Sequence, residues 1–160
     1  MRDITVEKIV LNMGCGAKTP IESAKTILER IVNLKIIITK TKRRSTFGMP
    51  KDKQIGCKVT IRNDDALLKR LLDAKDYKLS EKNFDVRGNL SFGINEYIDI
   101  PDMDYDPKIG VLGLDVCVTL ERPGYRVKRK RLARKLGKKH VITKEEAIAF
   151  MKEKFGVVIE

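Results

Sequence analysis

The chain has 160 residues, of which 42% are hydrophobic and 35% charged, and its formal net charge is +12. This length suits one ordinary domain with a core of its own, and the hydrophobic fraction argues against intrinsic disorder. No run approaches the roughly 18 apolar residues that a membrane span needs, and no apolar block follows the amino terminus. We therefore expect a cytoplasmic protein without a membrane partner.

The first strand is predicted over residues 6–13, because apolar and polar side chains alternate there. Leu11 and Met13 share one face, and Lys8 and Asn12 share the other. A period of two is typical of a strand with one buried face.

A helix follows over residues 20–32, where apolar residues recur at three and four spacing. Thr19 and Glu22 have the spacing of a capping box, and Pro20 suits the first helical position. The apolar run over residues 36–39 predicts a second strand.

A long basic loop is predicted between Lys40 and Gln54, with Phe47-Gly48 near its centre. Loops of this length inside a compact domain are usually functional or disordered. Strand alternation returns over residues 56–62, where Lys58, Thr60 and Arg62 share one face.

The next helix is expected to begin at Asn63 or Asp64, either of which can cap it. Further strands are predicted over residues 89–94 and 111–121. Between them, residues 96–106 contain five carboxylates and no basic residue.

A basic stretch occupies residues 122–140. It contains ten Lys or Arg and no Asp or Glu, so we expect a contact surface for a polyanion, with a solvated tail as the alternative. A C-terminal helix is predicted over residues 143–155, with a capping box at Thr143 and Glu146 and with Gly156 ending it. We expect residues 1–160 to form a single domain.

The predicted fold class is α+β, with a mostly antiparallel sheet, helices on one face and an open RNA-binding face. The open face combines cations with hydrogen-bonding side chains, which suit phosphates, 2′-hydroxyls and base edges. Its expected residues are Lys8, Asn12, Lys58, Thr60 and Arg62. The alternative is an ordinary solvated sheet face.

Other motifs fail on spacing. Gly14-Cys15-Gly16 lacks the third glycine of a dinucleotide fingerprint, and the aspartates of residues 102–106 lack the glycine and glutamate that complete a calcium loop. His140 is the only histidine and has no nucleophile at a spacing that pairs with it. Cys15, Cys57 and Cys117 show no metal-ligand spacing, so we expect them to be reduced and buried. We predict no enzyme activity, no cofactor and no metal site.

Several segments together resemble one family. They are Val10-Leu11-Asn12-Met13-Gly14, Phe47-Gly48 with Ile55-Gly56-Cys57-Lys58-Val59-Thr60, Asn83-Phe84-Asp85 with Gly88-Asn89, Ile100-Pro101 with Tyr105-Asp106, and 116–127. In this order they resemble the large-subunit ribosomal protein numbered five, which binds 5S rRNA. The segment 116–127 and the basic run after it resemble the archaeal and eukaryotic branch.

The resemblance implies a role for each group of residues. Sheet-face contacts to 5S rRNA are expected from Lys8, Asn12, Phe47, Lys58, Thr60 and Arg62. The loop facing P-site tRNA comprises Arg44, Thr46, Gly48, Met49 and Lys51. Contacts to 23S rRNA are expected from Lys40, Lys42, Arg126, Lys128, Arg129, Lys130, Arg131, Arg134, Lys135, Lys138 and Lys139. An intersubunit bridge to a basic protein of the small-subunit head is expected from Asp99, Asp102, Asp104 and Asp106.

The chain departs from the family at Asn33-Leu34-Lys35-Ile36, where members commonly read Gly-Gln-Lys/Arg-Pro. Leu34 has no amide with which to contact RNA. Two rival functions remain at this point. One is a free basic nucleic-acid-binding or chaperone module, and the other is an enzyme with a basic anion cleft, which needs converging titratable groups.

Overall fold

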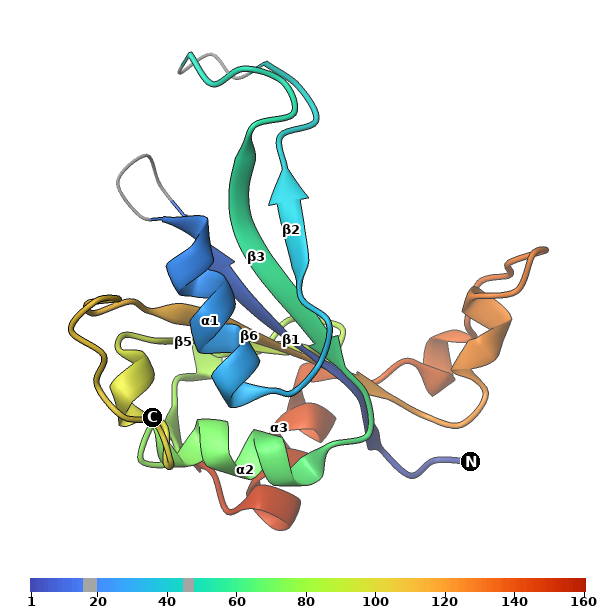
Figure 1. The fold of residues 1–160 in the computed structure, drawn as a ribbon. Coiled ribbons are helices and arrows are strands. Elements are labelled where there is room, and N and C mark those ends of the chain that lie inside the picture. Colours follow the sequence, from blue (N-terminus) through green and yellow to red (C-terminus); the bar gives the residue numbers. More distant parts are fainter. Residues whose placement is uncertain (16–19, 45–47) are drawn as a thin grey trace. The chain divides into compact units, whose positions relative to one another are not determined.

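The computed structural model describes residues 1–15, 20–44 and 48–160, and Figure 1 shows its helices and strands. The helices are α1 (Ile21–Ile31), α2 (Asp65–Asp73) and α3 (Lys144–Phe155). The strands are β1 (Thr5–Gly14), β2 (Ile37–Lys40), β3 (Gln54–Ile61), β4 (Lys78–Leu79), β5 (Leu90–Ile94), β6 (Leu114–Glu121) and β7 (Val158–Ile159).

The main sheet has the strand order β2-β3-β1-β6-β5 and is mostly antiparallel, which confirms the predicted α+β class. β2 pairs antiparallel with β3, so that Ile37 lies opposite Lys58 and Lys40 opposite Gln54. A separate parallel ribbon joins β4 to β7. The sequence analysis did not predict this ribbon.

The chain divides into two compact units. One consists of Met1–Ile9, Ile61–Phe92 and Cys117–Glu160, and we call it the terminal unit. The other consists of Val10–Thr60 and Gly93–Val116, and we call it the hairpin unit because it contains β2, β3 and the loop between them. Each is described below by itself.

The hairpin unit buries the apolar side of its strands together with one side of α1. Leu11, Met13, Cys57 and Val59 are all buried in β1 and β3. Buried residues of α1 recur every three or four positions, as a helix with one apolar face requires. They are Ala24, Ile27, Leu28 and Ile31.

The terminal unit contains α2 and α3, and each begins where its sequence predicts a cap. The Asp64 carboxylate accepts a hydrogen bond from the backbone N–H of Leu67 at 2.9 Å, so Asp64 rather than Asn63 caps α2. Thr143 and Glu146 form the complete capping box of α3. An ion pair between Lys154 and Asp65 links the two helices.

Two predicted boundaries differ from the structure. α1 begins at Ile21, with Pro20 as the preceding cap residue, whereas the predicted partner Thr19 lies outside the described residues. β6 begins at Leu114 and not at residue 111. A side chain on Gly113 would come within 2.8 Å of the Asn95 carbonyl oxygen, so this residue is packed against the neighbouring backbone. Within the described ranges, no helix has the length and apolarity of a bilayer-spanning segment.

Candidate nucleic-acid interface

The strand β3 presents polar side chains on the open side of the hairpin unit. Cys57 and Val59 are buried, and Lys58 and Thr60 between and beyond them are exposed. This is the predicted alternation of a strand with one solvent-facing side. A cation and a hydroxyl therefore lie on one face of the same strand, with only one buried residue between them.

Asn12 of β1 lies in a shallow hollow of the hairpin unit, about 420 Å³ in volume. Asn12 is half-buried, and Asn95 and Asp115 line the same hollow. Gly14, Gly93 and Gly113 also line it, and their lack of side chains leaves backbone accessible. Amides and a carboxylate can bind hydroxyl and base groups there. The sequence analysis did not identify Asn95 or Asp115.

The two remaining strand residues predicted to bind 5S rRNA belong to the terminal unit. Arg62 is exposed directly after β3. Lys8 is half-buried, and its Nζ lies 3.8 Å from the Glu7 carboxylate. Glu7 also binds Arg129 at 3.1 Å, so its negative charge is shared between two cations.

The loop between β2 and β3 is closed at its base by Thr41. The Thr41 hydroxyl donates to the Pro50 carbonyl at 2.7 Å, and its backbone N–H donates to the Lys53 carbonyl at 2.8 Å. Beyond this base, Arg44, Gly48 and Lys51 are exposed. Lys40 and Lys42 are exposed on the strand side of the loop, and Met49 is half-buried. Two predicted contacts, Thr46 and Phe47, lie outside the described residues.

The basic stretch leaves β6 and returns to α3, and it is drawn in orange in Figure 1. Its predicted rRNA-binding cations are all exposed, namely Arg126, Lys128, Arg129, Lys130, Arg131, Arg134, Lys135, Lys138 and Lys139.

A hydrogen-bonded clamp closes the basic stretch at its base. The Tyr125 hydroxyl donates to the His140 carbonyl at 3.2 Å and accepts from the Ile142 N–H at 3.0 Å. The His140 ring lies against Tyr125, and its Nε2 lies 3.0 Å from the Pro123 carbonyl oxygen. His140 is therefore a structural residue of this clamp, which the sequence analysis missed.

Arg129 is held by the protein itself. Its guanidinium pairs with Glu7 of β1 and with Glu121 of β6, both in the terminal unit. The Glu7 side chain is only 12% exposed, so this pair is better shielded from solvent than an ordinary surface pair. These two carboxylates already neutralise one of the cations that were predicted to bind rRNA.

The acidic segment of residues 96–106 differs along its length. Asp99, Asp102 and Asp104 are exposed, whereas Asp106 is half-buried. The Arg30 guanidinium, 2.8 Å away, and then the Lys108 backbone N–H hold the pKa of the Asp106 carboxyl below its ordinary value. Asp106 is therefore bound to α1 within its own unit, unlike the exposed Asp99 and Asp104.

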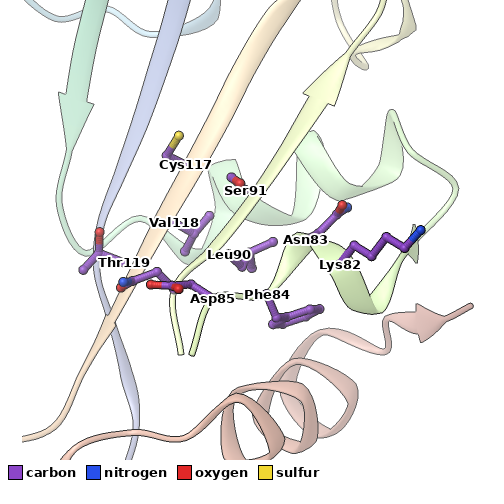
Figure 2. A pocket seen from close by; sticks show the side chains of 10 residues that line it. Lys82, Asn83, Phe84, Asp85, Leu90, Ser91, Cys117, Val118 and Thr119 are labelled. Carbon is purple, nitrogen blue, oxygen red and sulfur yellow. The ribbon is translucent and has the colours of Figure 1, made fainter. Parts of the chain in front are cut away.

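A second hollow, of about 460 Å³, lies on the terminal unit beside β5 and β6 (Figure 2). Most of its polar lining comes from the segment before β5 and from the outer side of the strands. The lining residues are Lys82, Asn83, Phe84, Asp85, Asn89, Leu90, Ser91, Cys117, Val118 and Thr119. None of these was predicted as a site residue, although the alternation of β5 and β6 places Ser91, Cys117 and Thr119 outward.

The cysteines differ from the expectation that all three are buried. Cys15 and Cys57 are buried, and burial raises the pKa of both thiols. Cys117 is exposed, so the prediction was wrong for this residue. Its buried neighbours Val116 and Val118 point to the other side of β6, which leaves Cys117 on the outer face.

Exposed cations on a sheet, on a closed loop and on a basic stretch define the class of protein, which is a nucleic-acid-binding protein. Comparison with known sequences identifies the family. Residues 54–150 match the C-terminus of the ribosomal protein uL5 family. The chain belongs to this family of ribosomal proteins, which are structural and not enzymatic, as the sequence analysis predicted.

Similar proteins match along the whole chain. The large ribosomal subunit protein uL5 of Methanococcoides burtonii is 42% identical, over 100% of this chain and 98% of its own length. Those of Cenarchaeum symbiosum and Nitrosopumilus maritimus are 48% and 46% identical, over 99% of this chain and 97% and 95% of their own lengths. These archaeal relatives agree with the branch that the segment 116–127 resembles.

Proposed function

We propose that this protein is a structural constituent of the large ribosomal subunit that binds 5S rRNA through the open face of its sheet. The observation that supports this most is the alternation in β3, which leaves Lys58 and Thr60 exposed above a buried core. Asn12, in the hollow of the same unit, adds an amide. A lysine contacts phosphate, and a hydroxyl and an amide contact sugar and base groups, which is the mixture that RNA recognition requires.

The basic segments bind 23S rRNA in this proposal. The exposed cations of residues 126–139, together with Lys40 and Lys42, contact phosphates, and each contact releases counterions. The clamp at Tyr125 and His140 supports the role because it holds both ends of the basic stretch at fixed positions. These cations supply affinity and salt dependence, whereas the sheet face selects the RNA.

Two further contacts belong to the proposal. The loop beyond Thr41, with Arg44, Gly48 and Lys51 exposed, contacts P-site tRNA. The acidic segment meets a basic protein of the small-subunit head through Asp99, Asp102 and Asp104. Asp106 supports the segment from behind through Arg30 rather than making the bridge itself.

The sheet-face contact is tested by filter binding of purified protein to isolated 5S rRNA. The variant Lys58→Ala with Thr60→Ala is expected to lower affinity and to reduce the slope of log affinity against log salt by about 1, because one phosphate contact is lost. The matched control is Lys25→Ala with Thr26→Ala, which removes the same residue types from α1 in the same unit. Equal binding by both variants and the unchanged protein would show the proposal to be wrong.

A further inference from the structure

We infer that the hollow beside β5 and β6 receives one unstacked nucleotide of the RNA, with its base inward and its phosphate at Lys82. The inference deepens the proposed function and rests on it, because it names what a part of the RNA does at a site outside the predicted contacts. Every lining residue belongs to the terminal unit, so the hollow is complete within that unit.

The walls of the hollow offer hydrogen-bonding groups that the protein does not use. Asn83 and Asn89 contribute amides, and Ser91 and Thr119 contribute hydroxyls. Within the described residues, none of these side chains makes a hydrogen bond to another protein group. A side-chain amide both donates and accepts, which matches the edge of a nucleobase.

The charges of the hollow set the orientation of the nucleotide. Asp85 lines the hollow, and its Oδ1 accepts the Val86 N–H at 2.7 Å, which leaves the other carboxylate oxygen available. This carboxylate repels a phosphate but accepts a hydrogen bond from a base amino or imino group. The cation of Lys82 is exposed, so the phosphate lies there and the base lies toward Asp85.

The size and lining exclude a stacked duplex from the hollow. A volume of about 460 Å³ is within the range of small-ligand sites, so it accommodates one nucleotide but not a helix. Leu90, Val118 and Phe84 give it an apolar side, and all three are at least 95% buried. A base inserted between the polar wall and this apolar side must first leave its stack, as bases of RNA loops and bulges do.

Cys117 provides a reporter that the chain already contains. Its thiol lines the hollow and is exposed, whereas Cys15 and Cys57 are buried. In the unchanged full-length protein, iodoacetamide should therefore modify Cys117 first. Saturating 5S rRNA is expected to slow this modification at least about tenfold, because the inserted base covers the sulfur. Free nucleoside monophosphates at millimolar concentration, tested in parallel, should not protect it, since they lack the other contacts of the RNA.

Side-chain changes distinguish an inserted base from RNA that only covers the face. Asn83→Ala with Asn89→Ala should weaken 5S rRNA binding about tenfold without changing the salt slope, and should restore much of the Cys117 reactivity. Lys82→Ala should reduce the salt slope by about 1, as the loss of one phosphate contact does. Asn33→Ala, an exposed asparagine of the hairpin unit, is the control and should change nothing.

Three results would overturn the inference. If 5S rRNA binds and Cys117 reacts as fast as in the free protein, the hollow is empty in the complex while the proposed function stands. If Cys117 is protected equally in the unchanged protein and in the asparagine variant, with equal affinity, the RNA covers the face without entering. If the unchanged protein binds no 5S rRNA at all, the proposed function and this inference both fail.

Discussion

The Arg122 guanidinium and the Glu146 carboxylate lie 2.9 Å apart and join the end of β6 to the first turn of α3. Arg122 is only 6% exposed, and its Nε has no hydrogen-bond partner within the described residues. Glu146 also accepts the Thr143 N–H in the capping box. One carboxylate thus caps a helix, partners a buried cation and holds together the two ends of the basic stretch.

We predict that Glu146→Gln lowers the free energy of unfolding by about 1–3 kcal/mol, because a buried guanidinium loses its charged partner while the capping acceptor remains. Urea denaturation measures this change. Glu145→Gln, on the adjacent exposed position of the same turn, is the control and should change stability by at most about 0.5 kcal/mol. Similar effects of the two substitutions would contradict the assigned role of Glu146.

The ion pair between Asp106 and Arg30 predicts a dependence of stability on pH. Arg30, and then the Lys108 N–H, keep the pKa of the Asp106 carboxyl lower in the folded protein. This stabilisation is present above the unfolded-state pKa of about 4 and is lost as pH falls through the folded value. Arg30→Gln should therefore lower the unfolding free energy near neutral pH and have little effect in strong acid. Urea denaturation across this range should show a constant difference if the pair is unimportant.

Arg129 should contribute less to RNA affinity than its neighbours, because Glu7 and Glu121 already neutralise it. Arg131→Ala is expected to reduce the salt slope of binding to 23S rRNA by about 1, and Arg129→Ala by clearly less. Glu121→Gln should in turn strengthen RNA binding, since it releases the Arg129 guanidinium. Equal slope changes for Arg129→Ala and Arg131→Ala would show that the RNA displaces both carboxylates.

The loop contact to P-site tRNA is tested by shortening the loop. Deleting residues 45–53 should leave 5S rRNA binding nearly intact and weaken tRNA retention on assembled ribosomes. Because that deletion also removes the Pro50 and Lys53 partners of Thr41, replacing 43–49 by a short Gly-Ser linker is the sharper variant. Unimpaired tRNA retention with the linker would sink the proposed tRNA contact.

Periodic features could be predicted from the sequence. The alternation of Lys58 and Thr60 with Val59 predicted the outward face of β3, and the spacing of Thr143 and Glu146 predicted the cap of α3. Both follow from local geometry that a few neighbouring residues determine. The same alternation also places Cys117 outward, and the expectation that it is buried followed only from the average behaviour of cysteine.

Contacts between distant residues could not be predicted. The clamp of Tyr125 with His140, the pairing of Arg129 with Glu7 and the ribbon of β4 with β7 each join separate segments. The strands of the ribbon have two residues each, too short to show a period. The hollow beside β5 and β6 combines three segments, so its polar lining becomes visible only in the folded chain.

The central claim is that the sheet face recognises 5S rRNA while the basic stretch supplies affinity without selecting the RNA. Chemical footprinting of 5S rRNA with purified protein, at increasing salt and with excess unrelated RNA, tests it most directly. We predict one compact protected region that persists in competitor with the unchanged protein and with Arg131→Ala, and that is lost with Lys58→Ala and Thr60→Ala. Protection that persists in the sheet-face variant but disappears with Arg131→Ala would contradict the claim.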